Sequence, residues 1–250
     1  MSATLGEALR SGRQLGVWAA LGDPRSTEVL GRSGFDLVVI DLQHGFATEA
    51  GLPGQLDALA ATPSFAAVRI QGVLPHQVMR CLDLGADGVV VPLVETADDA
   101  ARVVAAARYA PAGGRSWGPL WGQLGRPLPE PAEGDAAAAV IVMIETATGL
   151  ANLDAILATE GIDALYIGPN DLALSLGLGR VAWQDSPELQ RAATSIIERA
   201  GAAGVPVGID CQGREAVEFW AARGASLFLT DRDVNLLASS AAGALAALQS

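Results

Sequence analysis

The sequence contains no lysine, so all 16 of its basic residues are arginine. A lysine amine is the group that forms a Schiff base with a carbonyl substrate, and its absence excludes that mechanism. Any carbonyl chemistry in this protein must therefore use a metal ion or general acid–base groups. The basic residues are also outnumbered by 28 acidic ones, which gives a net charge of −12. A nucleic-acid partner would require a basic face, so we expect none.

Long apolar runs, cysteine and histidine are scarce as well. No apolar run is long enough to cross a bilayer, and the N-terminal stretch MSATLGEALRSGRQ lacks an apolar signal core. We therefore expect a cytoplasmic protein with no membrane partner. The two cysteines, Cys81 and Cys211, make no disulfide framework and have the apolar neighbours of small core residues. Of the two histidines, His44 follows a strand candidate, whereas His76 follows Pro75 at a predicted helix start and is interpreted as a surface residue.

The order of apolar and helical segments predicts an α/β fold, a single-domain (β/α)8 TIM barrel over residues 1–250. Half of the residues are hydrophobic, which is enough for a large core. Helical periodicity appears between the strand candidates, for example at 96–108, 187–203 and 213–223. A doubly wound sheet is the alternative, but it usually has a Gly-rich turn after its first strand, and none follows here. The strand candidates are 15–20, 36–40, 66–70, 88–92, 139–145, 164–168, 205–210 and 226–230.

Two segments stand apart from this alternation. The stretch at about 109–136 is rich in Gly and Pro, carries two tryptophans and is too long for an ordinary connection. We expect it to form a loop over the barrel mouth or one that reaches a neighbouring subunit. The last predicted helix, 234–248, is apolar on more than one face. Burial within the monomer is its default interpretation, and docking on another subunit is the alternative.

Charged side chains follow several of the apolar strands. In a parallel barrel the carboxyl ends of the strands form the active-site end, so these groups should converge there. Glu145 and Asp171 follow strongly apolar strands, and a buried carboxylate needs a partner. Two carboxylates with water and substrate oxygens suit Mg²⁺ or Mn²⁺. A helix cap is the alternative role for Asp171.

Three further residues suggest proton transfer and anion binding at the same end. Arg69 ends an otherwise apolar strand, either in a salt bridge or as a fixed donor for a carboxylate or an oxyanion. Asp41 stands three residues before His44, close enough to orient its imidazole as a general base. A core histidine without a catalytic role is the alternative.

Several stretches together resemble one family, the HpcH/HpaI aldolases, which are grouped with citrate lyase β-subunits. The segment 144–177 is highly specific for this resemblance, and the other stretches add to it in order along nearly the whole chain. They are FDLVVIDLQHG, VRIQG, CLDLGADGVVVPLVETADDA, RYAPAGGRS, IETATGLANLDAILATEGIDALYIGPNDLALSLG and GVPVGID.

The resemblance implies a metal-dependent aldolase that cleaves or forms 4-hydroxy-2-oxo acids from pyruvate or hydroxypyruvate and an aldehyde. It implies a divalent metal on Glu145 and Asp171, with Mg²⁺ or Mn²⁺ expected and Co²⁺ or Zn²⁺ as alternatives. It assigns enolate stabilisation to Arg69, and a catalytic dyad to His44 and Asp41.

The same resemblance implies how the substrates and the subunits are held. The backbone around Gly168, Pro169 and Asn170 would bind the substrate carboxylate. Asp83 would reach a neighbouring active site on the aldehyde side. The family forms homo-oligomers, hexamers built from trimers, with exchanged C-terminal helices. Trp117 and Trp121 would line the aldehyde pocket or lie at an interface.

The sequence departs from the family pattern at Gln43, where an acid is frequent, and at Met143, where a glutamine is frequent. These changes put the preferred nucleophile in question but leave the metal pair and Arg69 in place. An acyl-CoA lyase is one alternative, disfavoured by the acidity and the lack of lysine. A phosphate-handling barrel is another, disfavoured by the two acids in TDRDV after the last strand candidate. A catalytically silent barrel subunit is the third.

Overall fold

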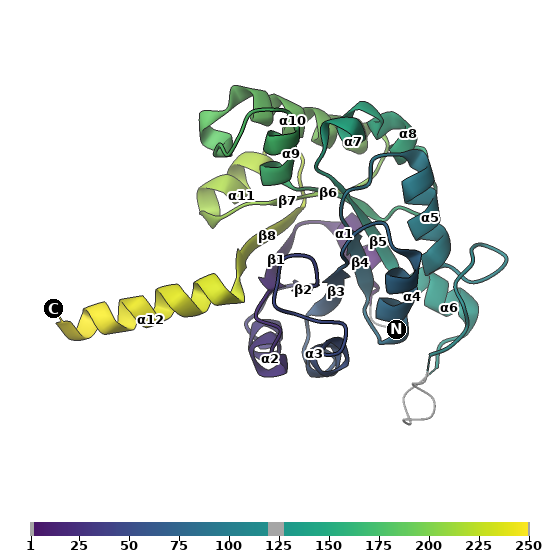
Figure 1. The fold of residues 1–250 in the computed structure, drawn as a ribbon, viewed down its shortest axis with the longest axis horizontal. Helices are drawn as coiled ribbons and strands as arrows, with labels where there is room; N and C mark the ends of the chain where they lie inside the picture. Colours follow the sequence, from purple (N-terminus) through teal and green to yellow (C-terminus); the bar gives the residue numbers. More distant parts are fainter. Residues whose placement is uncertain (1–2, 120–127, 250) are drawn as a thin grey trace.

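The computed structural model describes residues 3–119 and 128–249. Within them, eight parallel strands close into a barrel in which each strand pairs with its neighbours in sequence order (Figure 1). All eight strand predictions are confirmed. The strands are β1 Gln14–Ala19, β2 Leu37–Asp41, β3 Phe65–Arg69, β4 Gly88–Val91, β5 Ala139–Ile144, β6 Ala164–Ile167, β7 Val207–Asp210 and β8 Leu227–Arg232.

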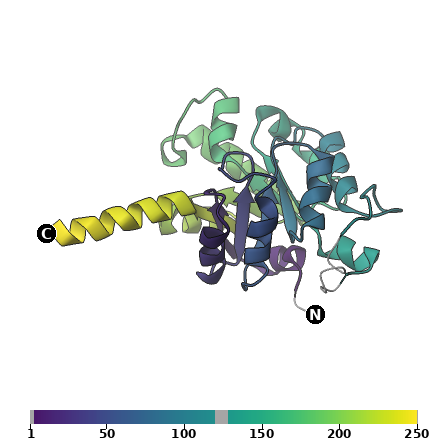
Figure 2. The same ribbon diagram turned by 60° about the horizontal axis from the view of Figure 1, so that its bottom comes forward.

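Helices connect successive strands and surround the barrel (Figures 1 and 2). Because the helices return the chain from the end of one strand to the start of the next, all the strands end on the same side. The helices are α1 Leu5–Ser11, α2 Pro24–Arg32, α3 Leu52–Leu59, α4 Pro75–Asp83, α5 Ala97–Ala107, α6 Pro131–Ala137, α7 Ala147–Ala151, α8 Leu153–Leu157, α9 Pro169–Ser175, α10 Pro187–Ala202, α11 Gly213–Ala221 and α12 Asp233–Gln249, with a 3₁₀ turn at Trp183–Asp185.

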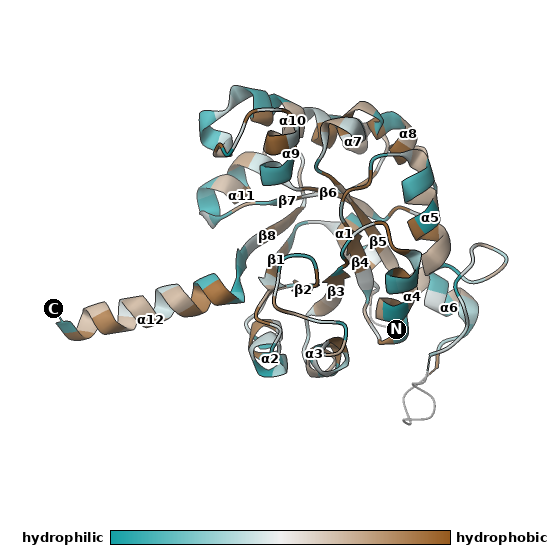
Figure 3. Ribbon diagram, in the orientation of Figure 1, coloured by the Kyte–Doolittle hydropathy of each residue, from teal (hydrophilic) through white to brown (hydrophobic). Residues whose placement is uncertain are grey.

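The core consists of two layers, because alternate residues of a strand point to opposite faces. One face of each strand packs against the helices, as Ile40 and Val68 do. The other face fills the barrel interior with residues such as Val39 and Ala67, and Leu5 of α1 packs into this inner layer. Strands such as β5 and β6 are accordingly brown in Figure 3, since both of their faces are buried. Buried, unpaired cysteines at Cys81 and Cys211 agree with their interpretation as core residues.

The described parts of the long loop, residues 109–119 and 128–136, lie at the opposite end of the barrel from the strand ends. They follow α5 and lead through α6 into β5, so they belong to the side where strands begin (Figure 1). The backbone N–H of Tyr109 donates to Asp135 at 2.8 Å, which ties the two described arms of the loop together. The expectation of a loop over the barrel mouth is therefore wrong, because that end of a barrel is formed by the segments after the strands. Trp121 lies outside the described residues.

Helix α12 leaves the barrel and extends away from it (Figures 1 and 2). Exposed leucines lie along it: Leu237 is 63% exposed and Leu248 is 86% exposed. Only its first residue, Asp233, is buried. The default expectation of a helix buried in the monomer is therefore wrong. Across the described residues, neither α12 nor any other helix has the length and apolarity needed to span a membrane.

Candidate active site

Strand register explains how two charged residues come together at the barrel mouth. Asp41 and Arg69 are aligned partners on neighbouring parallel strands β2 and β3. The residues two positions earlier, Val39 and Ala67, belong to the interior layer, so alternation directs Asp41 and Arg69 inward as well. Arg69 donates from Nε to Oδ1 of Asp41 at 2.9 Å and from Nη2 to Oδ2 at 2.7 Å. This fork-to-fork pair fixes the guanidinium at the end of the barrel interior.

The environment keeps this pair charged. Burial disfavours the Asp41 carboxylate, but the hydrogen bonds and charge of Arg69 outweigh it, and the backbone N–H groups of His44 and Gln43 add to them. The pKa of Asp41 is therefore held below its usual value. The Arg69 guanidinium lies 4.2 Å from the centre of the Trp18 ring, close enough for a cation–π contact.

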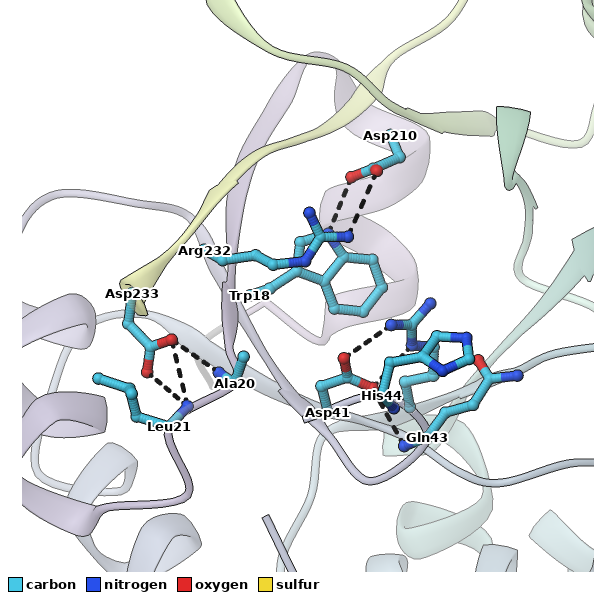
Figure 4. Close-up of polar contacts among 10 residues, drawn as sticks. Trp18, Ala20, Leu21, Asp41, Gln43, His44, Asp210, Arg232 and Asp233 are labelled. Carbon is cyan, nitrogen blue, oxygen red and sulfur yellow. Dashed lines mark hydrogen bonds and ion pairs between the residues drawn. The ribbon is translucent and has the colours of Figure 1, made fainter. Parts of the chain in front are cut away.

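His44 and Asp41 do not form the expected dyad. Asp41 Oδ1 accepts the backbone N–H of His44 at 3.2 Å, whereas its two oxygens are otherwise used by Arg69 and Gln43 (Figure 4). The exposed His44 side chain lines the edge of the cavity described below. Sequence adjacency placed the two residues correctly, but the turn after β2 presents the His44 backbone, not its ring, to the carboxylate.

Glu145 and Asp171 come from two further neighbouring strands, because Glu145 follows β5 and Asp171 follows β6. Glu145 is 2% exposed, and its Oε1 accepts the N–H of Leu93 at 2.9 Å. Leu93 has a φ of 58°, a left-handed conformation that is uncommon for leucine. Burial, reinforced by the charge of Asp171, raises the pKa of Glu145 to about 7 in spite of the Leu93 hydrogen bond and the charge of Arg69. Asp171 is therefore close enough for its charge to oppose the ionisation of Glu145.

Three observations test whether these acids fit a cation. A Cβ on Gly168 would collide with Oε2 of Glu145, so only glycine lets the β6–α9 turn approach this carboxylate. The helix-cap alternative for Asp171 is not met, because Gly168 is the N-cap of α9 and no side chain caps it. Among the described residues, Asp171 accepts no hydrogen bond, and no group of three metal-binding side chains exists there or elsewhere. The pair fits a hard cation whose other ligands are water and substrate oxygens.

A small cavity of about 90 Å³ joins these elements at the strand ends. The hydroxyl of Tyr166 lines it and, within residues 3–119 and 128–249, is a buried polar atom without a hydrogen-bond partner. Such an atom requires a ligand or water that the protein alone does not supply. The lining residues are Trp18, His44, Arg69, Met143, Tyr166, Gly168, Pro169, Asn170, Asp171, Asp210 and Arg232.

Trp18, Tyr166 and Arg232 complete the cavity, although sequence reasoning did not select them. The indole N–H of Trp18 donates to Asp210 at 2.9 Å, and Arg232 lies 3.7 Å from the other oxygen of Asp210 (Figure 4). Trp18 and Tyr166 resemble ordinary core residues of apolar strands. Arg232 was hidden because β8 is longer than predicted and shifts register between Gly16 and Trp18, which places Arg232 opposite Trp18.

The structure does not bring Asp83 and Trp117 to this cavity within one chain. Asp83 ends α4 at the opposite end of the barrel and accepts a hydrogen bond from Arg115 at 2.8 Å. The Arg115 guanidinium lies 4.6 Å from the ring centre of Tyr109, which packs against Trp117 at 5.2 Å. These four residues form a second polar cluster, called here the loop cluster.

The fold and the cavity together define a (β/α)8 barrel with a polar, carboxylate-bearing site at its strand ends. Comparison with known proteins gives the family. Residues 14–230 match the family model described as HpcH/HpaI aldolase/citrate lyase. The chain belongs to this family, so the resemblance found in the sequence is confirmed.

Individual relatives agree with this assignment. A 4-hydroxy-2-oxovalerate aldolase of Rhodococcus jostii is 40% identical over 93% of this chain and 90% of its own length. A 5-keto-4-deoxy-D-glucarate aldolase of Klebsiella pneumoniae is 41% identical over 78% of this chain and 77% of its own length. The solved structure of an HpcH/HpaI aldolase/citrate lyase family protein from Burkholderia cenocepacia superposes with a TM-score of 0.90 at 32% identity, covering 98% of this chain and 99% of the other. The expected enzyme class, a carbon–carbon lyase of the aldolase type, is supported by these relatives.

Proposed function

We propose that this protein is a divalent-metal-dependent aldolase that cleaves or forms 4-hydroxy-2-oxo acids, with pyruvate or hydroxypyruvate and an aldehyde as the smaller partners. The observation that carries the proposal is the pair of acids without a salt bridge, Glu145 and Asp171, close to the fixed Arg69 guanidinium. Asp171 and Arg69 line one cavity, and Glu145 interacts electrostatically with both. A metal-dependent aldolase requires these two features together, a place for the cation and a donor for the developing oxyanion.

Glu145 and Asp171 would hold the metal, with Mg²⁺ or Mn²⁺ suited to two carboxylates and additional oxygen ligands. When bound, the cation supplies Lewis-acid polarisation of the 2-oxo group. The substrate carboxylate would lie against the start of α9, where the N–H groups of Asn170 and Asp171 are directed out of the helix. Pro169 contributes shape only, since it has no N–H.

The remaining steps belong to Arg69 and to a proton acceptor. In the cleavage direction the C4 hydroxyl loses its proton, the C3–C4 bond breaks, and its electrons become the enolate while the aldehyde leaves. Arg69, locked by Asp41 and stacked on Trp18, would stabilise that negative charge without having to move. Protonation of C3 then gives the 2-oxo acid. His44, at the edge of the cavity, would take and return the proton through water or directly.

The test is exchange of the pyruvate methyl protons in D₂O, followed by proton NMR with Mg²⁺, Mn²⁺ or Co²⁺ and again with EDTA. We expect metal-dependent loss of the methyl signal, since enolate formation does not require the aldehyde. Glu145→Gln should abolish exchange, whereas the exposed Glu160→Gln is the matched control and should retain it. Absence of exchange with both pyruvate and hydroxypyruvate would overturn the proposal in favour of a silent barrel subunit.

We also propose that the chain assembles with copies of itself through α12, as a hexamer or trimer. The support is the row of exposed leucines on a helix that touches its own barrel only near Asp233 (Figure 3). Such an apolar surface is costly to leave in water. Light scattering on the wild type and on Leu237→Glu should show an oligomer that the substitution shifts to smaller species. A monomeric wild type would overturn this assembly.

A further inference from the structure

A second cavity of about 280 Å³ adjoins the small one at the barrel mouth. The two share Pro169, Asn170, Asp210 and Arg232 in their linings. A ligand held beside Glu145 and Arg69 would therefore extend past Asp210 and Arg232 into this larger space, called here the outer cavity.

The outer cavity is lined mainly by hydrogen-bonding groups. The exposed residues Asn170, Gln184 and Gln212 line it, and among the residues described none of their side-chain amides has a hydrogen-bond partner in the protein. Each amide can both donate and accept. Such a lining favours a ligand with hydroxyl groups. An alkyl group would displace the water bound to these amides without replacing its hydrogen bonds.

Where the two cavities meet, the positive charge of Arg232 is balanced by the negative charge of Asp210. Arg232 lies 3.7 Å from Asp210, whose other oxygen is held by the Trp18 indole N–H. A ligand carboxylate at this point would meet a guanidinium that already lies beside the Asp210 carboxylate, so Asp210 disfavours it.

We infer that the outer cavity selects aldehydes that carry a hydroxyl group beside the carbonyl, over both alkyl aldehydes and carboxylated ones. The inference rests on the proposed aldolase function, since it assigns the aldehyde half of that reaction. Asp210 is the residue that sets the selectivity: it accepts a hydrogen bond from the hydroxyl and masks the charge of Arg232.

The experiment measures carbon–carbon bond formation from pyruvate with three aldehydes in the presence of Mn²⁺. Glycolaldehyde carries the hydroxyl, propionaldehyde replaces that hydroxyl with a methyl group, and glyoxylate carries a carboxylate. We expect kcat/KM for glycolaldehyde to exceed that for each of the others by at least about tenfold. A propionaldehyde or glyoxylate value equal to or above that of glycolaldehyde overturns the inference.

Asp210→Asn tests the role of the charge itself. The amide keeps an acceptor for Trp18 but no longer neutralises Arg232, so the ratio of kcat/KM for glyoxylate to that for glycolaldehyde should rise about tenfold or more. Asp154→Asn, on the far surface of α8 and 82% exposed in its side chain, is the matched control and should leave the ratio unchanged. Because a partly unfolded variant loses activity with both aldehydes, the ratio separates selectivity from stability. An unchanged ratio in Asp210→Asn overturns the role of Asp210.

Methyl exchange of pyruvate without any aldehyde distinguishes the two levels of failure. Wild-type enzyme that does not exchange contradicts the proposed function itself. Wild-type enzyme that exchanges but shows no preference among the three aldehydes contradicts only the inference about the outer cavity.

Discussion

The two ends of the barrel contain nearly the same arrangement of side chains. At the strand ends, Arg69 pairs with Asp41 at 2.7 Å and lies 4.2 Å from Trp18. In the loop cluster, Arg115 pairs with Asp83 at 2.8 Å and lies 4.6 Å from Tyr109. An arginine held by an acid and stacked on an aromatic ring is therefore not by itself a mark of function.

The difference lies in what surrounds each pair. Arg69 borders a cavity that also contains a buried hydroxyl without a partner, and Glu145 and Asp171 lie beside it. Arg115 instead joins Asp83 on α4 to the long loop, and its bonds hold two segments together. Because Nε of Arg115 is also buried without a hydrogen-bond partner, an unpartnered polar atom alone does not separate the two ends. The cavity at the strand ends and the two acids beside it do.

The largest expected effect is the loss of activity when Arg69 is replaced. Arg69→Met should lower the rate of metal-dependent pyruvate exchange by about 10³-fold, because the enolate loses its fixed donor. The rate is measured by proton NMR. Arg191→Met, on the exposed surface of α10, is the control and should exchange at the wild-type rate. Near-normal exchange in Arg69→Met would remove Arg69 from the site.

The second expected effect concerns stability. Arg69→Met leaves Asp41 buried without its partner and should lower the free energy of unfolding by about 3–5 kcal/mol. Arg115→Met should cost about 1–2 kcal/mol, because the Asp83 side chain is 19% exposed and can regain water. Urea unfolding followed by circular dichroism measures both. Equal losses would mean that the two pairs are energetically alike.

The third expected effect is a pH dependence confined to the mouth. Burial raises the pKa of Glu145 from 4.5 to about 7, so the stability that its neutral form contributes is present below pH 4.5 and is lost as the pH rises through about 7. A cation binds the deprotonated form. The apparent Kd for Mn²⁺ should therefore rise by about tenfold for each pH unit below 7 and stay constant above it.

Calorimetric titration of Mn²⁺ between pH 5.5 and 8 measures this dependence. Glu145→Gln should bind the cation weakly at every pH and remove the step near 7. Removal of the metal with EDTA should lower the melting temperature more at pH 8 than at pH 6. A flat binding profile in the wild type would show that Glu145 is not the titrating ligand.

The smallest expected effect compares the two tryptophans. Trp18→Phe loses the hydrogen bond to Asp210 and weakens the stacking on Arg69, which should cost about 1–2 kcal/mol of unfolding free energy. Trp117 is 51% exposed, and Trp117→Phe should change that free energy by less than about 0.5 kcal/mol. Chemical unfolding of both variants gives the comparison, and a larger loss at Trp117 would reverse it.

Much of this architecture can be predicted from the sequence, because strands buried on both faces have continuous apolar segments. The charged residues that end such strands, Asp41, Arg69 and Glu145, stand out for the same reason. The directions of the side chains and the register of the strands could not be predicted in the same way. Asp41 accepts a hydrogen bond from the His44 backbone and not from its ring, and the register shift between β1 and β8 places Arg232 at the cavity although its segment resembles a loop.

The other errors have a similar physical origin. Apolar periodicity shows that a helix has an apolar face, but it does not show which surface packs against that face. For this reason the burial of α12 within the monomer was wrongly predicted. A Gly- and Pro-rich composition predicts a loop at about 109–136. Whether that loop lies at the active-site end or the opposite end depends on whether a strand or a helix precedes it, and here the helix α5 does. Trp18 and Tyr166 lie in apolar strand segments, as core residues do, and only their contacts reveal that they line the site.

Different strands of the barrel contribute the residues for the two halves of the proposed reaction, enolate formation and aldehyde binding. Asp41 ends β2 and Arg69 ends β3, and Glu145 and Asp171 follow β5 and β6. The junction with the outer cavity is built by the ends of β7 and β8. Substitutions on one arc of the barrel can therefore change which aldehyde is accepted, and those at Asp210 also affect Arg69 through the Trp18 ring that stacks on it. A directed-evolution library for new aldehydes belongs at Gln184, Asp210, Gln212 and Arg232, with the opposite arc held constant.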